Sequence, residues 1–163
     1  MRDGIPIPGT ARARLLDAAL TQFGAHDFDD VAVTDLAARA DVTTGSLYHH
    51  FGSKAGIYDA VRTDVERRLR DRMEGAAAVA ARPVEAALLV GYDYLVRAGF
   101  TRLLSERRPG DDPIEGFLTA HADAGGAPVA RLLLAAWREA LRAASTDAAG
   151  ARAALATVLG ARD

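Results

Sequence analysis

The chain of 163 residues contains no cysteine, which excludes disulfide bonds, cysteine-ligated zinc sites and a thiol nucleophile. Long apolar runs are also missing, because the richest one, residues 132–137, is far shorter than the roughly 20 residues that cross a bilayer. The first residues lack the apolar segment of a signal peptide. We therefore expect a cytoplasmic protein with no membrane partner.

An excess of positive charge is absent too. Lys and Arg together number 20 against 22 Asp and Glu, which gives a net charge of −2 and an isoelectric point of about 6.1. Proteins that bind nucleic acids often carry a surplus of basic residues. Judged by net charge alone, this chain is a poor candidate for that function.

The residues that are present favour an all-α fold. Half of them are hydrophobic, which is enough to bury a core. Ala, Leu and Arg dominate, clusters of β-branched residues are rare, and turn signals separate stretches with helical periodicity. The length suits one compact domain, or two small ones that share a helix.

Three short helices are predicted before residue 54. Thr10 caps the first, and the second spans residues 33–40. A turn at Asp41, a residue type that tolerates a left-handed backbone, leads to a third helix over residues 44–50, which Thr43 caps. The predicted core-facing residues are Leu16, Ala19, Leu20 and Phe23, then Val33, Leu36, Ala37 and Ala40. The arrangement is a helix-turn-helix unit.

The rest of the chain predicts longer helices. Gly52 and Ser53 end the third helix and cap a fourth, which runs from Lys54 to about residue 80. Another helix spans residues 83–99, and a less regular stretch follows, with breaks at residues 108–110 and 125–126. The fourth helix carries an apolar stripe that winds around it, formed by Ile57, Val61, Val65, Leu69 and Met73.

Two Ala- and Leu-rich helices are predicted to close the chain. One starts at Pro128, and the other follows a cap within residues 145–147. Their apolar stripes predict a homodimer in which they form half of a four-helix bundle across a two-fold axis. The alternative is that the stripes only close an intramolecular core.

The third helix has an unusual composition for a purely structural element. Leu47 and Phe51 are four residues apart and face the core, which leaves the other side chains at the surface. Gly45 costs a helix interior roughly 1 kcal/mol relative to Ala, and less near an end. The close approach of another surface is a natural reason for this glycine.

Polar groups near the start of this helix are suited to a nucleic-acid backbone. Thr43, Ser46 and the free N–H groups there can contact phosphates or base edges. Lys54 lies at the positive end of the next helix, where its ammonium can hold a phosphate. By contrast, Arg12 and Arg14 are expected to be solvated, with a smaller chance of touching phosphates.

The motif Leu-Tyr-His-His-Phe-Gly-Ser-Lys occupies residues 47–54, after Leu-Leu-Asp-Ala-Ala at residues 15–19 and Val-Thr-Asp-Leu-Ala at residues 33–37. With these motifs, residues 10–60 resemble the DNA-binding domain of the TetR/AcrR transcriptional regulators. The resemblance implies a homodimer that binds a palindromic operator, usually represses transcription and releases DNA when a small molecule enters the C-terminal domain. It implies DNA contacts from Thr34, Thr43, Thr44, Gly45, Ser46, Tyr48, His49, His50 and Lys54.

Three departures from the family pattern predict a modest and strongly salt-sensitive affinity for DNA. Ala32 stands where a capping Thr or Ser is frequent. Thr34 and Thr44 stand where basic residues are frequent, and Asp41 replaces the usual glycine of the turn.

The distribution of charge is more favourable to DNA binding than the total. Residues 42–58 contain no acidic residue and include Lys54, which is the only lysine of the chain. A phosphate responds to charge within a Debye length, about 8 Å at physiological salt. The local sign along this segment is therefore compatible with DNA.

Taken together, these patterns predict an all-α protein with a helix-turn-helix DNA-binding domain at residues 1–54 and a helical ligand-binding and dimerisation domain at residues 55–163. The predicted function is a ligand-responsive repressor. The alternative is a helical module that binds small molecules or proteins and has a weak or vestigial DNA-binding head.

Candidate ligand contacts are the large or polar-tipped residues of the second domain, although each of them singly fits a core role better. No catalytic residues and no cofactor are predicted, and His121 has no further metal ligands at suitable spacing. The candidates are Tyr92, Phe100, Phe117, His121 and Trp137.

Overall fold

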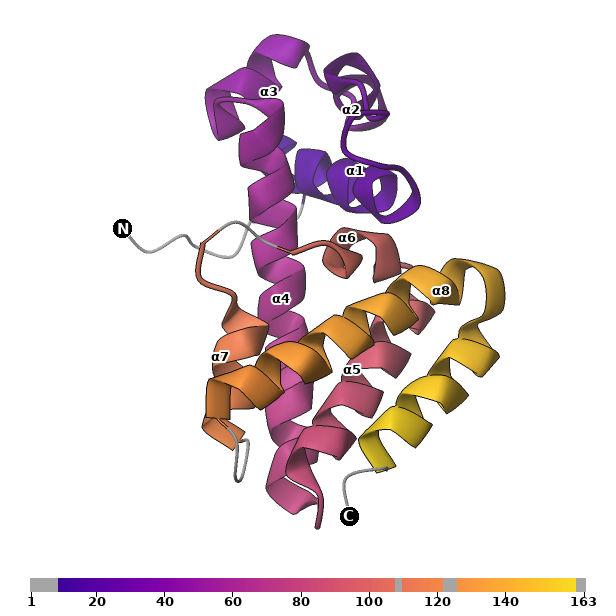
Figure 1. Ribbon diagram of the computed structural model, residues 1–163. Coiled ribbons are helices and arrows are strands. Elements are labelled where there is room, and N and C mark those ends of the chain that lie inside the picture. The colour runs from indigo at the N-terminus through magenta and orange to yellow at the C-terminus, as the bar shows by residue number, and fades with distance from the viewer. Residues whose placement is uncertain (1–8, 108–109, 122–125, 161–163) are drawn as a thin grey trace. The chain divides into compact units, whose positions relative to one another are not determined.

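The computed structural model describes residues 9–107, 110–121 and 126–160, and within these ranges all regular structure is helical (Figure 1). The predicted all-α class is confirmed. The helices are α1 (Ala11–Ala25), α2 (Val33–Arg39), α3 (Thr44–Phe51), α4 (Lys54–Val79), α5 (Pro83–Ala98), α6 (Thr101–Ser105), α7 (Pro113–His121) and α8 (Gly126–Gly160).

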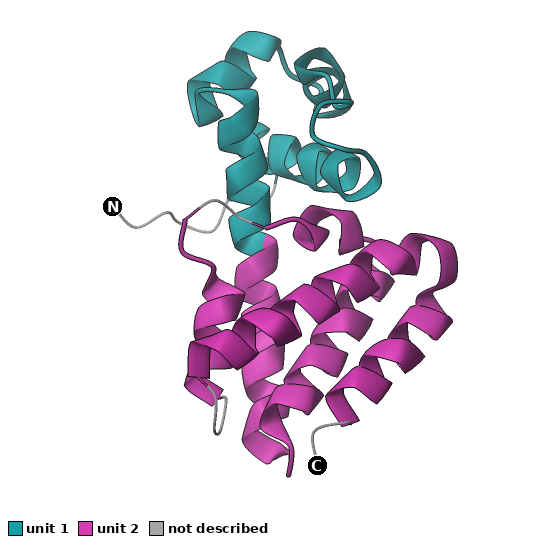
Figure 2. Cartoon of the chain, in the orientation of Figure 1, with its two compact units in different colours: residues 1–64 teal, residues 65–163 magenta. Residues whose placement is uncertain are grey.

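The chain divides into two compact units, residues 1–64 and residues 65–163 (Figure 2). The boundary between them falls inside α4. The two functional domains, expected at residues 1–54 and at residues 55–163, stay a prediction. None of the helices in the described part of the chain combines the length and the apolarity that crossing a bilayer requires.

The helix ends of the first unit follow the predicted caps. Thr10 Oγ1 accepts a hydrogen bond from Ala13 N at 3.2 Å, and Thr43 Oγ1 accepts one from Ser46 N at 3.2 Å. Ser53 Oγ accepts a hydrogen bond from a backbone N–H group in the first turn of α4 at 2.9 Å. Each cap pairs an N–H group that has no acceptor within its own helix.

The turn between α2 and α3 contains the predicted left-handed residue. Asp41 has a φ of 51° and is the non-glycine residue with a positive φ within the described ranges. Ala32 precedes α2 without a side-chain cap, in line with the departure predicted for this position.

The core face of α1 is displaced from the predicted one. Leu16 and Leu20 are half-buried instead of buried, and in α2 Val33 is half-buried while the preceding Val31 is buried. Both faces of α1 are apolar, so periodicity alone did not decide between them. The buried residues of α1 are Leu15, Ala18, Ala19 and Phe23, and those of the second predicted set are Leu36, Ala37 and Ala40.

The long α4 carries its predicted apolar stripe. Each of the five stripe residues, the first of which is Ile57 and the last Met73, is at most 2% exposed. In the second unit, α5 packs closely on this stripe. A Cβ added at Gly91 would lie 3.0 Å from Leu69 Cδ1 and 3.4 Å from Met73 Cγ. Glycine at this position therefore lets α5 approach α4 closely.

Two short helices, α6 and α7, occupy part of the stretch that was predicted to be irregular. Asp112 and Pro113 mark the start of α7 with the cap residue and first-turn proline that are typical of a helix N-terminus. The breaks predicted at residues 108–109 and at Gly125 lie outside the described residues.

The closing helix α8 begins at Gly126, two residues before the predicted start, and is interrupted as predicted within residues 145–147. Asp147 has non-helical angles (φ −147°, ψ 89°), and its Oδ1 accepts a hydrogen bond from Gly150 N at 2.9 Å. The part of α8 that follows Asp147 lies beside α5, where Arg152 donates to both carboxylate oxygens of Asp93 at 2.7 and 2.9 Å (Figure 1).

Candidate functional site

Helix α3 places most of its predicted DNA-contact residues at the surface. Leu47 is fully buried and Phe51 is half-buried, so the face opposite these two residues is open to solvent. Tyr48 is 51% exposed although it is a large aromatic residue. Thr43, Gly45, His49 and His50 are also exposed, whereas Thr44 and Ser46 are half-buried.

The remaining two predicted contacts come from neighbouring helices. Thr34 is exposed in the first turn of α2, and Lys54 is the half-buried first residue of α4. The imidazole rings of His49 and His50 lie edge to face, with their centroids 5.2 Å apart. The structure thus gathers seven of the nine predicted residues on α3 and its cap.

Two glycines of the first unit differ in what the fold demands of them. A Cβ added at Gly56 would lie 2.0 Å from Phe51 O, so the packing of α3 against α4 requires glycine there. A Cβ added at Gly45 would meet only Thr43 Oγ1, at an ordinary distance of 3.6 Å. Neither close packing nor a positive φ therefore requires glycine at position 45.

Lys54 makes contacts that its sequence position did not reveal. Its Nζ lies 4.4 Å from the centroid of the Phe28 ring and donates a hydrogen bond to Asp29 O at 3.3 Å. Phe28 in turn packs edge to face on Tyr58, with centroids 5.1 Å apart. The loop between α1 and α2 thereby holds the ammonium group beside the start of α4.

Two further basic residues, expected to be solvated, contact the helix-turn-helix. Arg14 is exposed, yet it donates hydrogen bonds to Ala40 O at 2.8 Å, Gly9 O at 2.9 Å and Asp41 O at 3.4 Å. The guanidinium of Arg12 lies 5.4 Å from the centroid of the Phe51 ring. Sequence patterns carried no signal for these contacts, because most of the acceptors are backbone carbonyls.

In the second unit, two of the candidate ligand residues have their polar tips bonded to backbone. Tyr92 is 1% exposed and its hydroxyl donates to Ala148 O at 2.7 Å, while Trp137 is 1% exposed and its Nε1 donates to Leu88 O at 2.9 Å. Burial, and then the charge of the neighbouring Asp93, raise the pKa of Tyr92. Both residues secure α8 to α5.

The other three candidates lie on or next to the short helices. Phe117 is buried and its ring is 4.3 Å from that of His121, whose Nδ1 lies 2.9 Å from Phe117 O. Phe100 is half-buried immediately before α6. The structure therefore pairs Phe117 with His121, and ligand contact by any of the five remains a prediction. Within the described residues, no cluster of His, Cys, Asp or Glu is arranged to hold a metal ion.

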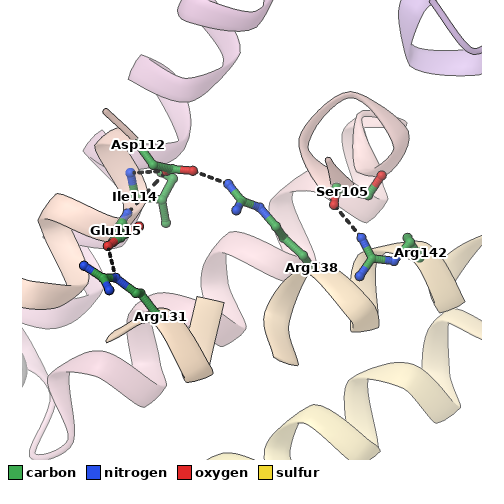
Figure 3. A network of polar contacts seen from close by, with 7 residues as sticks. All are labelled: Ser105, Asp112, Ile114, Glu115, Arg131, Arg138 and Arg142. Atoms are coloured by element: carbon green, nitrogen blue, oxygen red, sulfur yellow. Dashed lines mark hydrogen bonds and ion pairs between the residues drawn. The ribbon is translucent and has the colours of Figure 1, made fainter. Parts of the chain in front are cut away.

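Three arginines of α8 hold α6 and α7 in place (Figure 3). Arg138 pairs with Asp112, and these side chains are only 10% and 3% exposed. On either side, Arg131 Nε donates to Glu115 Oε1 at 2.8 Å and Arg142 Nη1 donates to Ser105 O at 2.7 Å. The sequence offered no means of pairing these residues.

Asp112 also caps α7, and its environment favours the charged form. Its Oδ1 accepts hydrogen bonds from Ile114 N at 3.0 Å and Glu115 N at 3.3 Å. Burial alone raises the pKa of Asp112, but the hydrogen bond and charge of Arg138, aided by the two N–H groups, outweigh burial and lower the pKa below its usual value.

The lowered pKa of Asp112 predicts how the stability of the folded chain changes at acidic pH. A carboxyl whose pKa is lower in the folded state contributes stability above its unfolded pKa, about 3.9, and loses it as the pH falls through the folded value. We expect Asp112→Asn to reduce the free energy of unfolding by the same amount at pH 7 and pH 5, and by progressively less below about pH 4. Urea denaturation of both proteins at each pH measures this difference.

Asp111→Asn is the matched control, because Asp111 is the exposed neighbour of Asp112. Its difference from the wild type should stay small throughout the pH range. An Asp112→Asn difference that does not change between pH 5 and pH 3 would show that the paired carboxylate does not contribute to acid sensitivity.

Comparison with known proteins gives a consistent result for the first unit. Residues 15–61 match the family described as bacterial regulatory proteins, tetR family. The transcriptional regulator BetI of Cronobacter sakazakii is 35% identical over 60 residues, 37% of this chain and 30% of the relative. The transcriptional regulatory protein RaaS of Mycobacterium tuberculosis is 39% identical over 67 residues, 41% of this chain and 31% of the relative.

The matched part of the chain thus spans less than a third of the length of these curated relatives. Solved structures resemble more of the chain. The SmeT–triclosan complex has a TM-score of 0.64 at 18% identity and covers 93% of this chain and 90% of its own. A TetR-family regulator from Pectobacterium atrosepticum has a TM-score of 0.62 at 23% identity and covers 92% and 89%. At such identities the likeness shows a shared fold.

Proposed function

We propose that this chain is a homodimeric repressor. The premise is that residues 15–61 form a DNA-binding domain of the TetR family of bacterial transcriptional regulators. In this proposal the dimer binds a palindromic operator in the cytoplasm and releases it when a small molecule binds the second unit. The curated relatives are transcriptional regulators, which favours this function over an enzymatic one.

The observation that carries the proposal is the exposed face of α3. This face lies within a segment free of acidic residues and includes Gly45, for which the fold has no structural need. An α-helix fits the major groove of B-DNA, about 12 Å wide, where side chains reach the base edges. A glycine in the first turn allows the helix to lie close against the sugar-phosphate backbone.

The proposed contacts divide by chemistry. Tyr48 and His49, both exposed, supply hydrogen-bonding groups to base edges or phosphates, while Lys54 supplies positive charge to a phosphate. Thr43, Thr44, Ser46 and His50 surround them on α3, and Thr34 adds a hydroxyl from α2. Because α3 contains no Lys or Arg, base contacts carry more of the binding energy than in a strongly basic domain.

The proposed dimer forms through the two parts of α8. Much of their apolar surface is used inside the chain, where Trp137 and Leu155 are buried. Leu132 and Val158 remain 72% and 49% exposed, and they provide the apolar surface that a second copy would cover. The two copies of α3 would then reach half-sites about 34–36 Å apart, or a multiple of that spacing.

A small-molecule effector is proposed by analogy with structural neighbours. Two of them are associated with small molecules, namely SmeT in its complex with triclosan and a gamma-butyrolactone receptor with a TM-score of 0.55. In this chain the second unit is the proposed site of the effector, with Tyr92, Phe100, Phe117, His121 and Trp137 as candidate contacts.

Selection from a random pool of duplex DNA tests the function directly. We expect the purified chain to enrich a palindrome, and we expect Tyr48→Ala and Lys54→Ala to lose binding to it by tenfold or more, as estimated from about 1–3 kcal/mol for each good contact. Enrichment of no sequence would contradict the proposal. It would favour the alternative of a helical module with a vestigial DNA-binding head, which the engagement of Lys54 by Phe28 and Asp29 also suggests.

A further inference from the structure

We infer that Arg14 is a positioning residue that sets the placement of α3 for DNA reading and does not bind a phosphate. The inference rests on the proposed DNA-binding function, and it assigns a role to a residue outside the predicted contact set. It is carried by the three hydrogen bonds of the Arg14 guanidinium and by the backbone of the turn that it holds.

The turn between α2 and α3 satisfies its own N–H groups but leaves carbonyls to be paired. Asp41 N donates to Ala38 O at 3.1 Å and Val42 N donates to Ala37 O at 3.0 Å, an arrangement common where a left-handed residue ends a helix. The carbonyl groups at the end of a helix have no intrahelical donor. Here Arg14 donates to the next two carbonyls, Ala40 O and Asp41 O.

The same guanidinium reaches a second segment of the chain. Its Nη1 donates to Gly9 O at 2.9 Å, directly before the Thr10 cap of α1. One planar group therefore joins the start of α1 to a turn whose two acceptors lie 26 and 27 residues after Arg14 in the chain. Arginine suits this role because its five donors are fixed in a plane, whereas lysine has a single mobile ammonium.

The position of this turn determines where α3 begins. Four residues, Ala40 to Thr43, connect the end of α2 to the first residue of α3, and the last of them is its cap. The last residue of α3 is also contacted from α1, because the Arg12 guanidinium lies over the Phe51 ring. The first turn of α1 thus contacts the turn that precedes α3 and the last residue of α3, the helix that carries most of the proposed DNA contacts.

Salt dependence separates a positioning role from phosphate binding. Each phosphate neutralised by a basic residue contributes about −0.9 to the slope of log K against log salt. A phosphate-binding Arg14 would therefore contribute about −1.8 in a homodimer. Arg14 already directs donors to three carbonyls, so its removal should leave that slope unchanged.

The test compares Arg14→Gln and Arg14→Lys with the matched control Arg39→Gln. Arg39 is an exposed arginine in the last turn of α2, and within the described ranges its side chain makes no hydrogen bond or ion pair. For each full-length protein, affinity is measured over a salt series for the palindrome selected by the wild type and for a scrambled duplex. Far-UV circular dichroism confirms that each variant is folded.

We expect both Arg14 variants to bind the palindrome about tenfold or more weakly, as for the loss of one or two well-aligned base contacts. We expect scrambled DNA to be bound as before and the salt slope to be unchanged. Arg39→Gln should not reduce the preference for the palindrome. A slope shallower by about 1.8 with equal losses on both duplexes would overturn the inference in favour of a phosphate contact. Unchanged affinity for the palindrome in Arg14→Lys would also overturn it.

Amide hydrogen exchange provides a readout that does not require DNA. In Arg14→Lys, which keeps the charge and most of the side chain, the Val42 and Ser46 amides should exchange faster while those of Ile57 to Val61 do not. If the wild type selects no DNA sequence, the proposed function fails, and this exchange result still reports whether Arg14 holds the turn. Unchanged exchange at Val42 and Ser46 would show that it does not.

Discussion

Replacement of Arg138 by methionine is expected to lower the free energy of unfolding by about 3–5 kcal/mol, the usual cost of removing one partner of a buried ion pair. Methionine fills a similar volume but leaves the 3% exposed carboxylate of Asp112 without its cation. Two N–H groups of α7 still bond Asp112 Oδ1, yet they do not neutralise a charge that has been removed from water.

A second substitution distinguishes a stranded charge from lost packing. Asparagine is as good a helix cap as aspartate, so Asp112→Asn combined with Arg138→Met keeps the cap of α7 and removes both charges. We expect the double variant to recover most of the stability lost in Arg138→Met, because replacing both partners of a buried pair is often close to neutral. Urea denaturation followed by circular dichroism at pH 7 measures the complete cycle.

Arg131→Met is the matched control for the cycle. Arg131 lies on the same helix and pairs with Glu115, but its side chain is 66% exposed, so the expected loss is below about 1 kcal/mol. A similar loss in Arg131→Met and Arg138→Met, or a double variant less stable than both single variants, would contradict the importance of burial for this pair.

The features that could be predicted from the sequence are local ones. The caps at Thr10, Thr43 and Ser53 each depend on residues within three positions, and the left-handed turn at Asp41 depends on one residue type. The exposed face of α3 followed from the four-residue spacing of Leu47 and Phe51, the two residues that were expected to face the core. In each case the physical cause lies within one turn of helix.

The features that were missed join distant parts of the chain. Arg14 bonds to carbonyls 26 and 27 residues away, and every residue has a carbonyl, so no sequence pattern marks the acceptors. Arg138 pairs with Asp112, 26 residues earlier, in a chain with many arginines. Helix α7 was missed because it is short, although Asp112 and Pro113 carried the signals of a helix start.

The largest expected effect on DNA binding comes from Gly45→Leu. Gly45 is exposed, and in the folded chain the Cβ of the new side chain meets only Thr43 Oγ1 at 3.6 Å, so the fold has room for a Cβ at this position. Leucine is also a better helix former than glycine, and we expect the free energy of unfolding to rise by as much as about 0.5–1 kcal/mol. The protein should therefore become slightly more stable.

The same leucine would project from the face of α3 that we propose lies against DNA. It would hold the helix away from the groove, so that several base contacts of about 1–3 kcal/mol each are lost together. We expect the affinity for the selected palindrome to fall by about 100-fold or more, and Gly45→Ala to give a smaller loss. Fluorescence anisotropy with labelled duplex DNA, together with urea denaturation, measures both quantities on the same samples.

Gly75→Leu is the matched control for this substitution, because Gly75 is an exposed helical glycine in α4 with no atom within 4 Å of an added Cβ. It should change stability in the same direction as Gly45→Leu without weakening DNA binding. Full operator affinity in Gly45→Leu would exclude α3 as the helix that enters the groove. A fall in affinity with a stable fold would place the DNA against the first turn of α3, since stability and binding would then change in opposite directions at one residue.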